Sequence, residues 1–197
     1  MSQSKYKLVR IKALLADLEI DRAITERQLE RHYHLDILGP PVKSFVRTVF
    51  PSASIDTFQH CKIYTLSTKV TRMQSGMVLH LLGTAEMRHA LGAGVEDWSS
   101  SAHRLGQTLI PDALWTTEHG EVAIEFDTGT YRYSLIDKKM RAFEKYAGVI
   151  WGTPSEQRAA RIHKLYPHVK TLTLATLEHL GRDVPHDLEA RRFGAYG

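Results

Sequence analysis

The stretch from Leu109 to Lys139 constrains the fold of this chain more than any other part of it. Two apolar, β-type runs lie on either side of the turn Glu118-His119-Gly120, a pattern that predicts a β-hairpin. The second run ends in Glu-Phe-Asp-Thr-Gly-Thr, and a helix that carries Lys138 and Lys139 follows. The centre of the chain is therefore predicted to be a hairpin that leads into a helix.

Three acidic residues mark this hairpin. Asp112 enters the first strand, and Glu125 and Asp127 lie two residues apart on the second. Because side chains alternate along a strand, Glu125 and Asp127 share one face. Neighbouring carboxylates repel one another unless a cation lies among them, and oxygen ligands suit Mg²⁺ or Mn²⁺. The pattern predicts a divalent-metal site held by Asp112 and Glu125.

The spacing of these acids resembles the core of the PD-(D/E)XK nucleases. Pro111-Asp112 matches the first motif and Glu125-Phe126-Asp127 the second, with Asp127 where the family usually has Lys. The resemblance implies a mixed sheet flanked by helices and a metal-dependent phosphodiesterase. The acidic Asp127 weakens the catalytic part of that implication.

The chain also resembles the replication-relaxation family of mobile-element proteins, best over residues 77–146. That family shows a Pro-Asp motif, then Glu-x-Asp-x-Gly-Thr, then a helix with Lys and an aromatic residue four positions on. It also has a His followed six residues later by an acid on a preceding helix. The matching residues here are Pro111-Asp112, Glu125–Thr130, Lys139 with Phe143, and His80 with Glu86; Thr128 departs from the basic residue expected there. The resemblance implies a part in plasmid replication and DNA relaxation.

The N-terminal part of the sequence predicts a winged helix-turn-helix. Apolar residues at helical spacing predict a first helix, and Thr25 opens a second with the form of a capping box. Pro40-Pro41 suits the first turn of a third helix, and two short β-type runs after Pro51 suggest a hairpin around Gln59-His60. The predicted ranges are helices 5–19, 25–35 and 40–49, then strands 55–58 and 62–66.

In a winged helix-turn-helix the third helix enters the major groove of double-stranded DNA and the hairpin lies along the backbone. Basic and hydroxyl side chains on these elements are the predicted DNA contacts. They are Lys43, Ser44, Arg47 and Thr48 on the third helix, and Lys62, Lys69 and Arg72 on or after the hairpin. The alternative is an ordinary solvated helix face.

The remainder of the sequence predicts a second, α/β unit. A polar linker over 68–76 precedes a helix over 77–91 that Gly92 ends, and Val95–Gly106 has no strong structural signal. After the hairpin, a helix over 134–147, a strand at 148–152, a helix over 154–165 and a strand over 169–175 suggest a parallel crossover. Ser134 and Thr153 are the predicted caps of the two helices. The predicted fold class is α+β or α/β, divided into a winged helix-turn-helix at 1–75, a nuclease-like domain at 76–181 and a loose tail at 182–197.

Composition narrows the class of protein. Of 197 residues, 43% are hydrophobic, enough for a sizeable core, yet no apolar run is long enough to cross a membrane. The net charge of +4 is compatible with nucleic-acid binding. The single cysteine and the absence of an apolar signal core favour a reducing cytoplasm. The sequence leaves open whether the protein acts as a homodimer.

Three hypotheses follow from the sequence. In the first, the protein is a DNA endonuclease: Asp112 and Glu125 bind Mg²⁺ or Mn²⁺, Asp127 and Glu86 assist, and Lys139 replaces the missing motif lysine. In the second, the fold is kept without the reaction, and the protein is a replication or transcription factor of a mobile element. In the third, the carboxylates are only structural. The negative charge of Asp127 favours the second hypothesis over the first.

Overall fold

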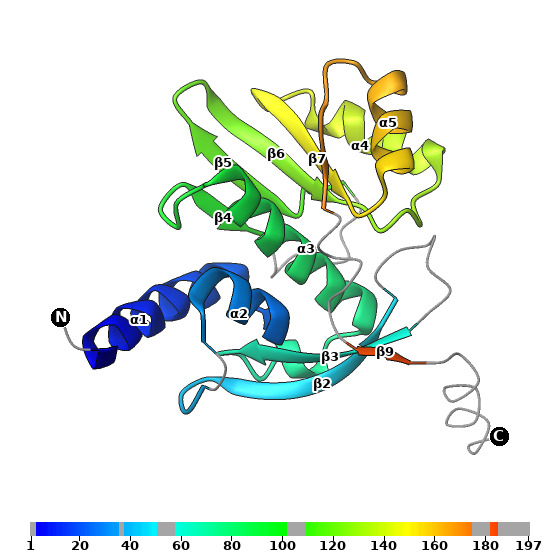
Figure 1. Cartoon of the computed structure of the whole chain (residues 1–197). Coiled ribbons are helices and arrows are strands. Elements are labelled where there is room, and N and C mark those ends of the chain that lie inside the picture. The colour runs from blue at the N-terminus through cyan, green and yellow to red at the C-terminus, as the bar shows by residue number, and fades with distance from the viewer. Residues whose placement is uncertain (1–2, 36–37, 51–57, 102–108, 175–181, 185–197) are drawn as a thin grey trace.

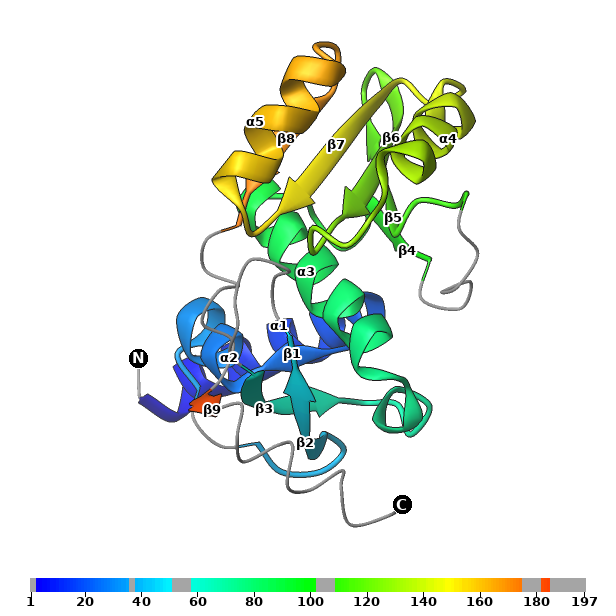
Figure 2. The ribbon, with the colours of Figure 1, turned by 90° about the vertical axis from the view of Figure 1, so that its right-hand side faces the viewer.

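The computed structural model describes residues 3–35, 38–50, 58–101, 109–174 and 182–184 (Figure 1). Two sheets lie at opposite ends of the molecule, with a long helix between them (Figures 1 and 2). The first sheet is built mainly from the N-terminal third of the chain and the second from residues after 97. The structure is a mixed α+β fold, as the sequence predicts.

The N-terminal half begins with the two predicted helices. In α2, the Thr25 side chain accepts the N–H of Gln28, and the Gln28 side chain accepts the N–H of Thr25, so the predicted capping box is confirmed. An antiparallel hairpin and a short 3₁₀ helix follow. The elements are α1 (Gln3–Asp21), β1 (Ile24–Thr25), α2 (Glu26–Tyr33), β2 (Lys43–Val49), β3 (Phe58–Thr65) and η1 (Val70–Arg72).

The predicted third helix is wrong, because Lys43–Val49 forms strand β2. Val42, Phe45, Val46 and Val49 have a helical spacing that would bury all four on one face, but Val46 is 66% exposed. Phe45, Val46, Thr48 and Val49 have the aromatic and β-branched side chains that favour strands. All of β2 pairs with β3. The hydrogen bonds of this pairing stabilise the strand, whereas the helical spacing of the apolar residues has no such partner.

The order of elements is therefore helix, helix, hairpin, helix, and the recognition helix of a winged helix-turn-helix is not formed before the hairpin. Gln59 and His60, predicted as the hairpin turn, lie inside β3 and pair with Val49 and Thr48. Of the predicted strand 55–58, residues 55–57 lie outside the described residues. The first sheet has the order β1-β3-β2, and β9 (Arg182–Val184) also pairs with β3.

The residues of β9 were predicted to begin a loose tail. They instead form an antiparallel strand beside Phe58–His60, which ties the chain after residue 181 to the first sheet. This pairing joins positions more than 120 residues apart, and no local signal in a three-residue strand indicates it. Residues 185–197 of the predicted tail lie outside the described residues.

Helix α3 (Ser75–Leu91) forms the centre of the molecule (Figure 2). It ends where predicted: Gly92 has a φ of 66° and its N–H bonds to the carbonyls of Arg88 and His89. All residues from Val78 to Arg88, apart from the half-buried His80, are buried. A helix buried on all sides in this way must lie between packed layers.

The second sheet contains the predicted hairpin and crossover. Strands β4, β5 and β6 are antiparallel, and β6, β7 and β8 are parallel, in the order β4-β5-β6-β7-β8. Strand β4 was missed within a segment that has no strong signal, and residues 102–106 of that segment lie outside the described residues. The elements are β4 (Trp98–Ser100), β5 (Ala113–Thr117), β6 (Gly120–Phe126), α4 (Tyr133–Phe143), β7 (Gly148–Thr153), α5 (Glu156–Leu165) and β8 (Lys170–Thr173).

The two predicted caps of α4 and α5 are displaced. The N-cap of α4 is Arg132, without a side-chain bond, rather than Ser134. The N-cap of α5 is Ser155, whose side chain accepts the N–H of Arg158, rather than Thr153. Thr153 instead belongs to the end of β7, because the parallel pairing with β8 continues through Thr173.

The two faces of the second sheet pack against different helices. Phe126 of β6 touches α3 so closely that a Cβ on Gly83 would lie 2.3 Å from its ring, and a Cβ on Gly152 would lie 2.4 Å from Met87. The opposite face packs against α4 and α5 through Trp151, Ile136 and Ile162. The face of each β6 residue therefore decides which helix it contacts.

Helix α3 also packs against the first sheet, so one core joins the two halves. Cys61 and Ile63 of β3 belong to the same buried cluster as Ile124 and Phe126 of β6. The division of the chain near residue 75 stays a prediction.

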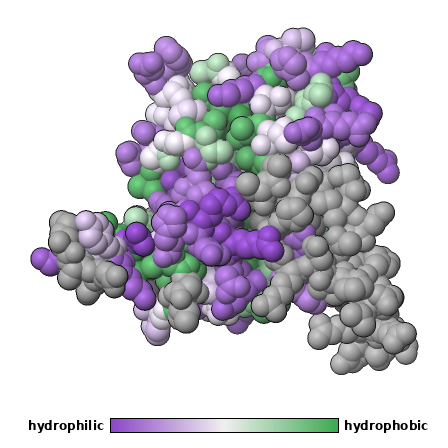
Figure 3. All heavy atoms as spheres, viewed as in Figure 1, coloured by the Kyte–Doolittle hydropathy of each residue, from purple (hydrophilic) through white to green (hydrophobic). Residues whose placement is uncertain are grey.

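In the surface view, hydrophilic residues gather near α1 and α2, and hydrophobic ones show in the upper half (Figure 3). No helix in the described ranges is long and apolar enough to cross a membrane.

Candidate functional site

Asp112 lies immediately before β5 and binds the end of β6. Its Oδ2 accepts the backbone N–H of Phe126 at 2.9 Å and lies 3.0 Å from Nδ1 of His80 on α3. Burial is the largest influence on the His80 ring and lowers its pKa, but the charge and hydrogen bond of Asp112 outweigh it and leave the pKa raised. Asp112 therefore favours the protonated form of the His80 ring.

Glu125 is fully buried and faces α4. Its Oε1 lies 2.8 Å from Nζ of Lys139, which is itself only 4% exposed at the side chain. Burial, and then the negative charge of Asp112, raises the pKa of Glu125 well above its usual value against the opposing charge of Lys139. Hydrogen bonds from Lys139 and Tyr131 also oppose this rise in the pKa of Glu125. Glu125 therefore has two partners, Lys139 on α4 and Tyr131 just before that helix.

Asp127, also fully buried, is held by backbone and by α5. Its Oδ1 accepts the N–H of Gly129 at 2.7 Å, and its Oδ2 lies 3.0 Å from Nε and 2.9 Å from Nη2 of Arg158. Nη2 of Arg158 also donates to the carbonyl of Tyr131 at 2.6 Å. Both carboxylate oxygens of Asp127 are engaged in a fixed, charge-assisted arrangement.

Tyr131 joins these groups and was missed in the sequence, although it directly follows the Glu125–Thr130 motif. Its hydroxyl lies 3.4 Å from Nε2 of His80. An Asp–His–Tyr chain activates the hydroxyl only if the tyrosine can lose its proton. Burial and the negative charge of Glu125 raise the pKa of Tyr131, so the phenol stays protonated and is a poor nucleophile.

Arg158 was also missed, because nothing in the sequence links it to Asp127. The contact arises from the parallel crossover, which returns α5 over the carboxyl end of β6. We name the six residues Asp112, His80, Glu125, Lys139, Asp127 and Arg158 the carboxylate cluster. In it, each of the three predicted acids has its own cationic side chain.

Cationic side chains of the protein lie beside all three carboxylates of the carboxylate cluster. Three carboxylates need a compensating cation, and His80, Lys139 and Arg158 supply that charge within the protein. Asp112, Glu125 and Asp127, all described residues, do not bring three potential ligand atoms within 4.8 Å of one another. Nζ of Lys139 lies 2.8 Å from Oε1 of Glu125, so a metal ion bound to that oxygen would have to displace the ammonium group.

The structure does not bring Glu86 to this cluster. Glu86 also lies on α3, but it faces α2, where its carboxylate contacts Arg31, accepts Nε2 of Gln28 at 2.9 Å and lies 3.2 Å from Nε2 of His32. The six positions from His80 to Glu86 turn a helix through about 600°, so the two side chains leave on different sides. Glu86 joins α2 to α3.

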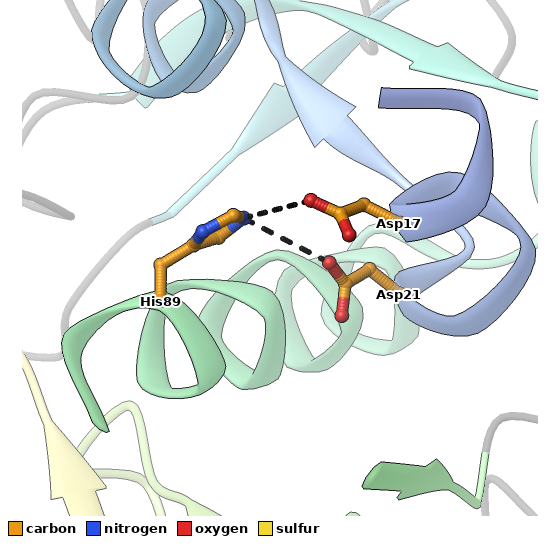
Figure 4. Close-up of side chains that lie close together, drawn as sticks. All are labelled: Asp17, Asp21 and His89. Atoms are coloured by element: carbon orange, nitrogen blue, oxygen red, sulfur yellow. Dashed lines mark ion pairs between the residues drawn. The ribbon is translucent and has the colours of Figure 1, made fainter. Parts of the chain in front are cut away.

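One group of described residues has the geometry to hold a metal: Asp17 and Asp21 of α1 with His89 of α3 (Figure 4). The His89 Nε2 lies 3.9 Å from Asp17 and 4.0 Å from Asp21. However, Nη2 of Arg88 lies 3.0 Å and 2.8 Å from the same two carboxylates, and the Tyr33 hydroxyl donates to Asp17. A guanidinium already supplies the positive charge there, so this group is a structural ion-pair network.

The predicted DNA contacts are divided by strand alternation. Arg47 lies on the same side of β2 as the buried Val49, is half-buried, and donates Nη2 to the carbonyl of Thr71 at 2.8 Å. Thr48 lies 2.9 Å from the ring of His60, and Lys62 pairs with Glu26 at 3.1 Å. Residues Lys43, Ser44, Lys69 and Arg72 are exposed. The single basic helix face predicted from the sequence does not form.

A model of the replication-relaxation family matches residues 7–160. The chain belongs to this family. The match covers more than three quarters of the sequence, from the first turns of α1 into α5. No curated protein and no solved structure matches the chain.

Membership in the replication-relaxation family confirms the resemblance found in the sequence. The matched range contains all six residues of the carboxylate cluster as well as the basic residues of β2, β3 and η1.

Proposed function

We propose that this replication-relaxation protein is a non-enzymatic DNA-binding factor that acts in the replication or regulation of a mobile element. One observation carries the proposal: each acid that resembles a nuclease motif is paired, inside the protein, with its own cation. The nuclease-like arrangement then stabilises the second sheet, and DNA is held elsewhere.

Burial of the carboxylate cluster supports this. The side chains of Glu125 and Asp127 are 0% exposed, and that of Asp112 is 11% exposed. A catalytic ion must touch both its carboxylate ligands and the scissile phosphate. Helices α4 and α5 cover the carboxylates of Glu125 and Asp127, so a phosphodiester can approach these two only if their ion pairs first break.

Exposed basic residues near the hairpin are the proposed contacts to double-stranded DNA. Lys43, Lys69 and Arg72 are exposed, and none has an ion-pair partner in the described part of the chain. Ser44 and Lys62 add a hydroxyl and a further cation. Cations without a protein partner are free to displace the counterions of a phosphate backbone. Arg47 is removed from the set because its guanidinium is bound to η1.

The test is duplex binding measured by fluorescence anisotropy across a salt titration. We expect wild-type protein to bind, and K43A/K69A/R72A to bind more weakly with a log–log salt slope lower by about 0.9 for each lost phosphate contact. The matched control replaces Lys138, Lys164 and Lys170, exposed cations of the second half, by alanine. Equal loss in both triple variants, or no binding by wild type, would contradict the proposal.

A Mg²⁺- or Mn²⁺-dependent DNA endonuclease is the second candidate function. The observation that favours it is the proximity of Asp112 and Glu125: the negative charge of Asp112 raises the pKa of Glu125, and two neighbouring carboxylates suit a shared divalent ion. Supercoiled plasmid incubated with the protein and either metal decides between the two. The first proposal expects no nicked product; nicking that chelator and D112A both abolish would establish the endonuclease.

A further inference from the structure

A cleft of about 510 Å³ opens beside the start of β2, where the end of α1 and the segment after β3 meet. Three cationic side chains line it: Arg22, Lys43 and Lys69. Its volume lies within the range of about 300–1,000 Å³ that is usual for ligand sites. We name it the Arg22 cleft. Lys43 and Lys69 were predicted DNA contacts, but Arg22 was not singled out in the sequence.

The cations of the Arg22 cleft have no ion-pair partner among the described residues, and the one acid that lines it is Glu19. Like charges gathered without partners repel one another, and an anion in the cleft removes that repulsion. The cleft therefore suits a phosphate.

The backbone holds this lining in place. Arg22 follows α1 with a φ of 70°, its N–H bonds to the carbonyl of Leu18 at 3.1 Å, and its carbonyl accepts the Thr65 hydroxyl at 2.6 Å. Glycine is the usual residue in this left-handed position after a helix, and any other residue there costs free energy.

The cleft has an apolar lining as well as a charged one. Leu66, Val70 and Met73 contribute to its wall. A bare phosphate leaves such a surface wet, whereas a nucleotide offers both a phosphate and a flat ring to cover it. In duplex DNA the bases are stacked inside and only their edges are accessible, so an unpaired base fits the cleft better.

We propose that the Arg22 cleft binds one unpaired nucleotide of a DNA strand, with its phosphate against Arg22, Lys43 and Lys69 and its base against Leu66, Val70 and Met73. This inference rests on the proposed DNA-binding function and specifies the form of DNA that the protein prefers: a duplex with an adjoining single-stranded segment.

The experiment compares a fully paired duplex with the same duplex carrying a single-stranded extension, by fluorescence anisotropy. Wild-type protein is expected to bind the extended DNA about tenfold more tightly, because the extension adds a phosphate beside three cations and an apolar contact that the paired duplex lacks. R22Q/K43Q/K69Q is expected to lose that preference, and to bind the paired duplex more weakly than wild type because only Lys62 and Arg72 of the proposed duplex cations remain. K138Q/K164Q/K170Q, which loses the same charge from the second half, is expected to keep the preference. In a second measurement, ultraviolet crosslinking of an iodinated base in the extension should label Met73.

The outcomes separate the two proposals. Equal affinity of wild type for both DNAs, or equal loss on both in R22Q/K43Q/K69Q, would overturn the cleft assignment and leave duplex binding standing. A free mononucleotide that competes as well as the extended strand would assign the cleft to a free nucleotide instead. No binding of wild type to either DNA would overturn the proposed function, and the cleft assignment with it.

Discussion

The charged side chains discussed for function have different surroundings in the two halves of the molecule. In the second-sheet half, Glu125, Asp127 and Lys139 are buried and each faces an opposite charge at 2.8–2.9 Å. In the first-sheet half, Arg22, Lys43, Lys69 and Arg72 are exposed, and none has an ion-pair partner in the described part of the chain. The acids of the nuclease-like motifs in the second half are thus each paired inside the protein, whereas these cations of the first half are open to a partner.

The difference shows how burial changes the meaning of a charged residue. A buried charge must be paired inside the protein, so it contributes to the fold and is costly to expose. An exposed charge adds little to stability and is available to a partner. A sequence motif does not show whether its side chains are buried, so the same three acids fit both a catalytic and a structural interpretation.

The largest effect should follow from breaking a buried pair. R158A leaves the carboxylate of Asp127 buried without its guanidinium, and we expect a loss of about 3–5 kcal/mol in the free energy of unfolding. R161A is the matched control, since Arg161 lies one turn further on α5, is exposed, and donates to the Tyr133 hydroxyl at 3.3 Å. Urea denaturation measures both; similar midpoints would show that the Asp127–Arg158 pair does not stabilise the second half.

Local signals in the sequence predicted the elements with strong patterns. The capping box at Thr25, the stop at Gly92, the hairpin around Glu118-His119 and the parallel crossover are all confirmed. Each depends on residues within a few positions of one another or on a long periodic run. These same patterns placed Asp112 at the start of one strand of the hairpin and Glu125 near the end of the other.

Features that depend on distant contacts were not predictable in this way. Strand β2 has a helical apolar spacing, and only its pairing with β3 fixes it as a strand. Arg158 reaches Asp127 across 31 positions, and β9 reaches β3 across more than 120. The cationic partners that decide the chemistry of the carboxylate cluster come from three helices, α3, α4 and α5, and a motif confined to the hairpin cannot contain them.

The next prediction compares the two ends of α3 through pH. Burial, then the charges of His32 and Arg88, lowers the pKa of His89 to about 4, from an ordinary value near 6.5. The unfolded chain therefore binds a proton more readily than the folded one, and stability is lost as pH falls from 6.5 toward 4, by up to about 3 kcal/mol. H89Q should remove most of this loss, measured as the change in unfolding free energy between the two pH values.

His80, on the side of α3 that faces the carboxylate cluster, should behave in the opposite sense. Its pKa is raised in the folded protein, so its contribution is fully present below about pH 6.5 and is lost as pH rises through the folded value. H80Q should therefore flatten the stability profile above neutral pH and not below it. Identical changes in the two variants would show that the halves do not differ in this respect.

A smaller effect should follow from tightening the contact between α3 and the second sheet. G83A places a Cβ within 2.5 Å of the Phe126 ring, which is fully buried and cannot move freely, so we expect a loss of about 1–3 kcal/mol. Gly76, in the first turn of the same helix, has no atom within 4 Å of such a Cβ, and G76A should not destabilise the protein. Thermal unfolding distinguishes them, and a silent G83A would show that this interface is loosely packed.

The smallest effect should come from the exposed pair between Lys62 and Glu26. Its two charged atoms lie 3.1 Å apart, close to the 2.8 Å of the Lys139–Glu125 pair, but the side chains are 43% and 51% exposed. Water already solvates both charges, so K62A should leave the denaturation midpoint unchanged within error, whereas K139A should lower it clearly. If Lys62 contacts a phosphate, as we propose, K62A should still lower the salt slope of duplex binding by about 0.9. A destabilised K62A would make its loss of binding an effect of folding. A stable K62A with an unchanged slope would remove Lys62 from the DNA-binding set, and the proposed DNA-binding cations would then be those of the Arg22 cleft and Arg72.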